Sequence, residues 1–218
     1  MKNKLFLLML FFLCLFGYGI VNALNLPLLG KVIYIDPGHG GRDPGAISGN
    51  IYEETINLEI SLKLQEVLEK SGAIVYLTRY DDYDLSVKNA VSRKRSDLSR
   101  RANIINASSA DMYISIHLNA DTSATWKGAQ IFYEDVNEEN EKIARILQEQ
   151  LKCDLNTNRE YKKLSNQYMY KRIKVKGVLA EVGFITNPNE RYLLKQSDYQ
   201  YKIAESLSNG IIKYFTNN

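Results

Sequence analysis

Short apolar runs alternate along this chain with segments whose apolar residues recur at helical spacing, and no other feature limits the fold as strongly. Strand-like runs rich in β-branched residues cover 31–35, 73–79, 112–116, 128–134 and 177–184. Helix-like segments cover 52–70, 97–108, 138–151, 189–196 and 199–215. Such alternation is typical of an α/β fold with a largely parallel sheet. We therefore expect a single α/β domain, in which helices flank both faces of a twisted, mostly parallel sheet of about six strands.

The chain contains 2 histidines, and each follows a strand-like run. His39 lies in DPGHGGRDPGA, just after KVIYI, and His117 directly follows MYISI. A single histidine in such a turn would be read as a hydrogen-bonded structural residue. Two in equivalent places favour a shared site, because ligands of α/β sheets bind beyond the carboxyl ends of the strands.

Acidic residues supply further candidates for this site. Glu181 lies inside the apolar run GVLAEVGF, where a carboxylate is costly unless it is paired or close to a metal. It is predicted to be a general base; the alternatives are a surface-facing position or an arginine partner. Glu53 and Glu54 begin the first long helix, where the helix dipole explains one acid. The other is expected to bind a metal, and imidazole with carboxylate is a ligand set that zinc prefers in hydrolases.

The N-terminus has the pattern of a secretory signal. MKNK carries two lysines and precedes an uncharged apolar run over 5–21, and Val21-Asn22-Ala23 resembles a cleavage site. The run is slightly short for a spanning helix, which needs about 20 apolar residues, and an uncleaved anchor is the alternative. We expect a signal peptide or N-terminal membrane anchor over 1–23, a functional domain over 24–218, export from the cytoplasm, and membrane contact only through the N-terminal segment.

The net charge and the cysteine content argue against a nucleic-acid-binding protein and against a fold held by disulfides. The net charge of +3 is too small to indicate a nucleic-acid partner. The denser basic stretch 88–101 is interpreted as a solvated helix face. Removal of the signal would leave Cys153 as the single cysteine, so the mature chain could form no intramolecular disulfide.

Four motifs, DPGHGGRDPGA, YEETINLEISLKL, SIHLNAD and LAEVGFITN, occur in this order. Together they resemble the zinc-dependent N-acetylmuramoyl-L-alanine amidases over nearly all of residues 31–215. The resemblance implies one zinc ion held by His39, Glu53 and His117, with Glu181 as the catalytic acid–base. The family often has lysine where Glu54 stands, so the chain departs there, and Glu53 is the preferred ligand. Arg101 matches a recurrent family arginine, which would either bind substrate or stabilise structure.

Longer stretches, KRSDLSRRANIIN, SIHLNADTSATWKGAQIFYE and VKGVLAEVGFITNPNE, are similar to the CwlD-type amidases of spore-forming bacteria. That branch implies a role in forming muramic lactam in spore cortex, through hydrolysis of the amide between N-acetylmuramic acid and L-alanine. The expected substrate is therefore peptidoglycan glycan strands with stem peptides. A zinc peptidase or deacetylase acting on the cell wall, or a non-catalytic wall-binding protein, is the alternative. Only 121–127 separates the segment HLNA from the strand-like run GAQIFYE, which leaves no room for an inhibitory insertion. Control of the activity is therefore expected to come from expression, zinc loading or a partner, and the expected partner is an accessory activator protein.

Overall fold

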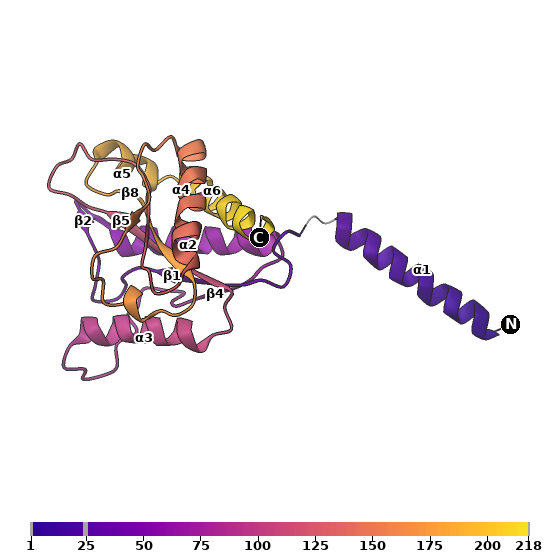
Figure 1. The fold of residues 1–218 in the computed structure, drawn as a ribbon. Coiled ribbons are helices and arrows are strands. Elements are labelled where there is room, and N and C mark those ends of the chain that lie inside the picture. The colour runs from indigo at the N-terminus through magenta and orange to yellow at the C-terminus, as the bar shows by residue number, and fades with distance from the viewer. Residues whose placement is uncertain (1, 24–25, 218) are drawn as a thin grey trace.

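The computed structural model describes residues 2–23 and 26–217, with side chains described over 3–15 and 26–217. Helix α1 (Lys2–Ala23) stands apart from the rest of the molecule (Figure 1). Among the described residues, no helix is both long enough and apolar enough to cross a membrane. The expected boundary between the N-terminal segment and the domain falls at residues 24–25, outside the described residues.

A six-stranded sheet forms the centre of the domain, in the order β4-β1-β5-β8-β6-β7. The strands are β1 (Val32–Pro37), β4 (Ile74–Leu77), β5 (Met112–Asn119), β6 (Gln130–Tyr133), β7 (Lys162–Lys163) and β8 (Gly177–Phe184). All neighbouring strands run parallel except β6 and β8, which are antiparallel. The predicted α/β fold with a mostly parallel sheet is therefore confirmed.

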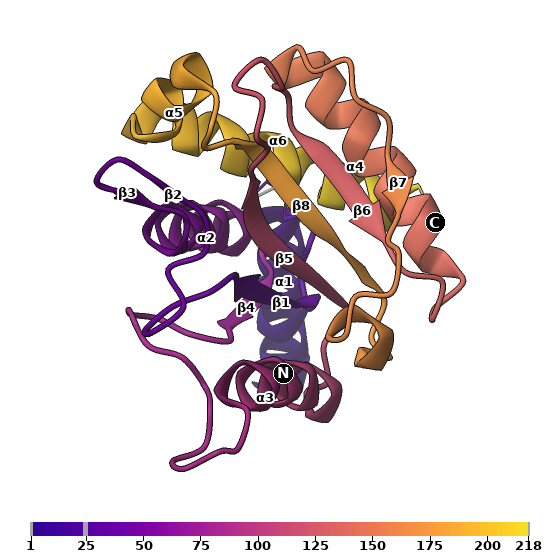
Figure 2. The ribbon, with the colours of Figure 1, turned by 90° about the vertical axis from the view of Figure 1, so that its left-hand side faces the viewer.

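Helices cover both faces of the sheet, as the sequence predicts (Figure 2). One face carries α2 (Glu53–Lys70), α4 (Glu139–Leu155) and α6 (Ser197–Thr216). The opposite face carries α3 (Arg93–Ala107) and the short 3-10 helix η1 (Tyr170–Arg172). A further helix, α5 (Pro188–Leu194), follows β8 and contacts α6.

Two apolar cores result from this layering. The larger lies between the sheet and helices α2, α4 and α6, and it includes the fully buried Ile35, Ile60 and Leu207. The smaller lies under α3 and η1 and includes Ile105 and Ile173. The central strands β5 and β8 are buried on both faces, which explains why they appear in the sequence as nearly continuous apolar runs.

Strand register places three polar side chains in one row across the sheet. His117 on β5 pairs with Glu181 on β8, and Glu181 pairs with Gln130 on β6. Residues paired in this way project from the same face, and alternate residues along a strand share that face. Leu179, two residues before Glu181, packs in the α3-side core. The row therefore lies on the α3 face, near the carboxyl ends of β5 and β8.

Some elements differ from the sequence predictions. Strand β5 continues to Asn119, so His117 lies within the strand and not just after it. Helix α3 begins at Arg93, four residues before the predicted start, with Ser92 as its N-cap. Strand β7 and the small hairpin of β2 (Ile47–Ser48) and β3 (Ile51–Tyr52) were not expected.

Candidate metal centre and its surroundings

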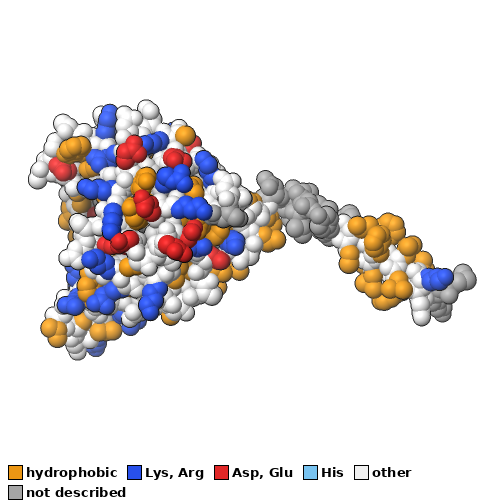
Figure 3. Space-filling model, in the orientation of Figure 1, with side chains coloured by type: hydrophobic (Ala, Val, Ile, Leu, Met, Phe, Trp, Pro, Cys, Tyr) orange, Lys and Arg blue, Asp and Glu red, His pale blue; other side chains and the backbone are white. Residues whose placement is uncertain are grey.

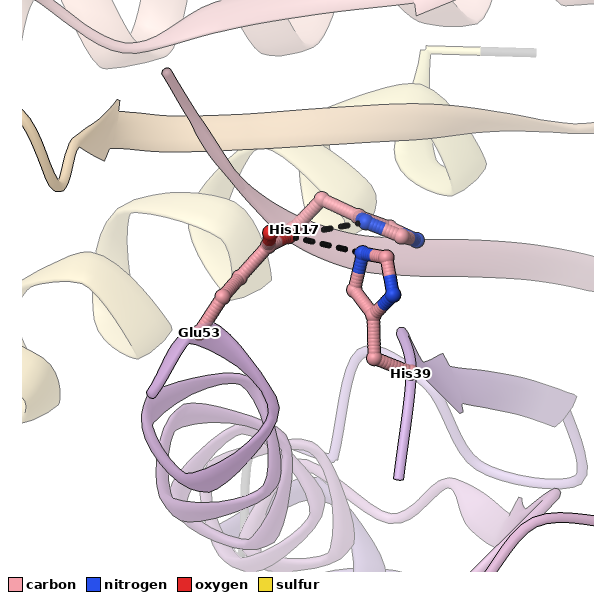
Figure 4. A group of neighbouring side chains, drawn as sticks. All are labelled: His39, Glu53 and His117. Atoms are coloured by element: carbon pink, nitrogen blue, oxygen red, sulfur yellow. Dashed lines mark hydrogen bonds and ion pairs between the residues drawn. The ribbon is translucent and has the colours of Figure 1, made fainter. Parts of the chain in front are cut away.

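Three side chains from three separate elements converge at one edge of the sheet (Figure 4). Glu53 Oε1 lies 3.2 Å from His39 Nε2 and 3.0 Å from His117 Nδ1. The two imidazole rings lie edge to face with centroids 4.8 Å apart. The loop after β1, the first turn of α2 and the end of β5 supply these residues. The structure thus brings together the two histidines and one of the two acids that the sequence singles out.

The Glu53 carboxylate is buried and held in a fixed position. It is 4% exposed, and its Oε1 accepts a hydrogen bond from the Leu118 backbone N–H at 3.1 Å. Its Oε2 accepts one from the Ala46 backbone N–H at 2.8 Å. Burial alone would raise the pKa of Glu53, but the hydrogen bonds and charges of His117 and His39 outweigh it and hold this pKa well below its ordinary value. The site therefore contains an ionised carboxylate.

His39 has a carboxylate behind it. Its Nδ1 lies 3.1 Å from Asp43 Oδ2, while its other nitrogen faces Glu53. Burial lowers the pKa of His39, but the hydrogen bonds and charges of Glu53 and Asp43 outweigh that effect and the pKa is raised. A carboxylate of this kind commonly orients metal-binding imidazoles and raises their basicity. The sequence analysis did not single out Asp43, although it lies four residues after His39 in the same motif.

Two glycines of the His39 loop allow this close approach. A Cβ atom on Gly38 would lie 2.2 Å from His117 Nε2. A Cβ on Gly45 would lie 2.6 Å from Glu53 Oε2, and Gly45 also has a positive φ of 68°. The glycines in this motif therefore serve the packing of the site itself as well as the turn.

Glu54 is turned away from the histidines. Its Oε1 accepts a hydrogen bond from Thr55 Oγ1 at 2.5 Å, and its Oε2 lies 4.0 Å from Arg79 Nη1. Of the two adjacent acids, Glu53 is the one beside His39 and His117.

Glu181 lies next to this group on strand β8. One of its oxygens, Oε2, is buried and has no hydrogen-bond partner among the described residues. Burial raises the pKa of Glu181 to about 7; the His117 charge lowers it and the Glu53 charge raises it. A carboxyl group with a pKa near neutrality can both accept and return a proton at physiological pH.

Arg101 is fully buried behind the His39 loop. Its Nε donates to Asp97 at 2.9 Å, its Nη1 to Asp36 at 2.9 Å, and its Nη2 to the His39 carbonyl at 2.5 Å. Arg79, also fully buried, donates to two more carbonyls of the same loop. Both arginines therefore fix the loop backbone through hydrogen bonds to its carbonyls. The sequence did not single out Arg79.

The chemistry of this donor set fits a zinc ion. One ligand atom from each of His39, Glu53 and His117 lies within 4.8 Å of the others. Two imidazole nitrogens with one carboxylate oxygen form a ligand set of catalytic zinc sites, which keep a further position open. Glu181 Oε2 has no hydrogen-bond partner among the described residues and lies beside this group. It would be available to accept a hydrogen bond from a water molecule at that open position.

Comparison with known proteins agrees with this geometry. Residues 33–213 match the family model of N-acetylmuramoyl-L-alanine amidase. The chain is 45% identical to the germination-specific N-acetylmuramoyl-L-alanine amidase of Bacillus subtilis, over 88% of this chain and 83% of that protein. Among solved structures, the CwlD amidase from Clostridioides difficile in complex with the GerS lipoprotein is 40% identical, with a TM-score of 0.82 over 87% of this chain and 100% of that one. An N-acetylmuramoyl-L-alanine amidase from Clostridium difficile 630 is 30% identical, with a TM-score of 0.77 over 86% of this chain and 98% of that one. The chain therefore belongs to the N-acetylmuramoyl-L-alanine amidase family of enzymes.

Proposed function

We propose that this protein is a zinc-dependent hydrolase of the amide bond between N-acetylmuramic acid and L-alanine in peptidoglycan. The observation that carries the proposal is the convergence of His39, Glu53 and His117, with Glu181 on the adjacent strand. Membership of the amidase family supports the choice of bond. A cell-wall zinc peptidase or deacetylase would use similar ligands, but the relatives described above are amidases.

Each residue of the site has a defined role in the proposed reaction. His39, Glu53 and His117 would hold the zinc ion, which when bound activates water and polarises the scissile carbonyl. Glu181 would take a proton from the attacking water and return it to the leaving amine. Its pKa near 7 suits both directions of proton transfer.

Arg101 has a positioning role in this proposal. Its guanidinium is enclosed by Asp36, Asp97 and backbone carbonyls, so it would act by fixing the His39 loop. The pKa of Arg101 shows the same balance: burial lowers it, but the charges of Asp36 and Asp97 outweigh burial and raise it.

We place the reaction in the spore cortex, where removal of stem peptides from glycan strands would precede formation of muramic lactam. The support is similarity to a B. subtilis amidase named as germination-specific and to the CwlD amidase of C. difficile. Residues 1–23 would deliver the enzyme across the cytoplasmic membrane. The described apolar side chains of α1 are exposed to solvent and gather there (Figure 3), among them Leu5 at 71% and Phe6 at 64% exposure.

We also propose that an accessory activator protein binds this enzyme. The four glycines of the His39 loop suggest a flexible segment that a partner would order, but buried arginines hold the loop through its carbonyls. The CwlD amidase of C. difficile, which was solved in complex with a lipoprotein, supports the proposal of a partner.

Mass spectrometry of a muramoyl-peptide fragment incubated with the zinc-loaded protein tests the proposed reaction. The expected products are a free lactyl carboxyl on the muramic acid and a peptide with a free L-alanine amine. Glu181→Gln should retain zinc and lose about 10²- to 10⁴-fold in turnover. Removal of an acetyl group would identify a deacetylase instead, and cleavage between two amino acids would identify a peptidase. Binding of glycan without any cleavage would indicate a wall-binding protein.

A further inference from the structure

We infer that Arg159, together with Lys162, forms a binding subsite for a carboxylate of the stem peptide, on the side of the scissile bond from which the amine leaves. This inference rests on the proposed function and names a specificity determinant for it. Neither residue lies in the motifs that define the metal centre.

Arg159 stands at the far end of the polar row that begins at the metal centre. The row runs from His117 through Glu181 to Gln130 across three adjacent strands. Gln130 Oε1 accepts a hydrogen bond from Arg159 Nη1 at 2.8 Å. Neighbouring strands lie about 4.8 Å apart, so the guanidinium lies roughly two strand spacings, about 10 Å, beyond Glu181.

A surface cavity of about 300 Å³ opens at this end of the row. Its lining combines aromatic side chains with two cations: Trp126, Phe132, Phe184, Arg159 and Lys162. Lys162 pairs in register with Phe132, and both project toward the same face of the sheet as Gln130. Asp121 also lines the cavity, so the three charged groups sum to one positive charge.

The guanidinium of Arg159 is held rigidly and keeps donors available. It lies 4.5 Å from the Phe184 ring centroid and 5.3 Å from that of Trp126, and its Nε donates to the Lys127 carbonyl at 2.9 Å. Its Nη2 makes no hydrogen bond to any residue that the structure describes. Arginine stacked on aromatic rings loses little entropy when it binds a carboxylate, and its planar fork matches that group.

The direction of the reaction places the peptide on this side. The scissile carbonyl belongs to the lactyl group of the sugar and would face the ion that His39, Glu53 and His117 would hold. The amine belongs to the peptide and would receive its proton from Glu181. The peptide therefore starts near Glu181 and extends away from His117, toward β6. Extended peptide advances about 3.3–3.6 Å per residue, so a carboxylate within two or three residues of the cut reaches Arg159.

Two muramoyl-peptide substrates that differ at one group test this inference. In one, the peptide carboxylate nearest the L-alanine is free, and in the other it is amidated. The native protein should cleave the free acid with a kcat/KM about tenfold higher, the size expected for one partly exposed charge-assisted hydrogen bond. Arg159→Met, which keeps a long unbranched side chain but removes the guanidinium, should lose this preference through a higher KM for the acid alone.

Matched variants and a second measurement keep the outcomes separate. Lys163 neighbours Lys162 but points to the other face and pairs with Asp135, so Lys163→Gln should leave the preference unchanged while Lys162→Gln weakens it. An unchanged preference in Arg159→Met, or an equal loss on both substrates, overturns the inference while the amidase function stands. If the native protein cleaves neither substrate, the proposed function fails. Calorimetric binding of the free peptide acid and its amide then still tests the subsite: tighter binding of the acid that depends on Arg159 supports it, and equal binding overturns it.

Discussion

Replacing Gly38 by alanine should disable the metal centre while leaving the fold in place. The new Cβ would lie 2.2 Å from Nε2 and 2.3 Å from Cε1 of His117. An ordinary contact begins at 3.4 Å, so the imidazole must move by roughly 1 Å. Metal–ligand distances tolerate about 0.2 Å, so His117 could no longer bind the ion together with His39 and Glu53. Even the loss of a residue that only hydrogen-bonds to a metal ligand commonly lowers metal affinity about 10- to 100-fold. We expect zinc binding at least about a hundredfold weaker, close to 3 kcal/mol.

Competition against a chromophoric chelator measures this affinity, and thermal unfolding without zinc reports on the fold. Gly49→Ala is the matched control, because its Cβ meets no atom within 4 Å although its φ is 62°. That strain should cost about 1–2 kcal/mol of stability and leave zinc affinity unchanged. Zinc affinity of Gly38→Ala within about threefold of the native value would refute the steric reasoning. Zinc binding would then not depend on the position that the structure gives the His117 imidazole.

Three further outcomes follow from the buried charges. Without zinc, burial raises the pKa of Glu181 from 4.5 to about 7. The folded protein then binds the extra proton between these pH values, and native stability relative to Glu181→Gln should fall by about 3 kcal/mol from pH 4 to pH 8. Urea unfolding checks this, and a constant difference would contradict it. Arg101→Met leaves two buried aspartates without their arginine partner and should lower the free energy of unfolding by about 3–5 kcal/mol in the same urea assay. A higher KM with unchanged stability would indicate that Arg101 binds substrate instead. Elemental analysis should find zinc retained in Glu54→Gln and lost in Glu53→Gln, and the reverse would exchange their roles.

The fold could be predicted from the sequence wherever strands are buried on both sides. Strand β8 is such a case, since the apolar run that contains it leaves few alternatives. Strand β7 consists of Lys162 and Lys163 at the sheet edge, and two exposed charged residues carry no strand pattern. Its existence depends on pairing with β6, which is a tertiary contact.

The same distinction holds for the site. The positions of His39 and His117 after two apolar runs predicted that they share a site, because parallel strands end at one edge. The supporting contacts depend on three-dimensional packing: Asp43 behind His39, and Gly38 against His117. For Arg101, sequence resemblance left two roles open, whereas its burial depends on how α3 packs on β1.

X-ray diffraction from crystals of the zinc-loaded protein, measured at the zinc absorption edge, tests the central claim most directly. We predict one strong anomalous peak per chain, bound at about 2.0–2.2 Å by nitrogens of His39 and His117 and an oxygen of Glu53. Glu181 should lie beside the ion without binding it. An anomalous map with no peak at this position, or a zinc ion bound by other residues, would contradict the account.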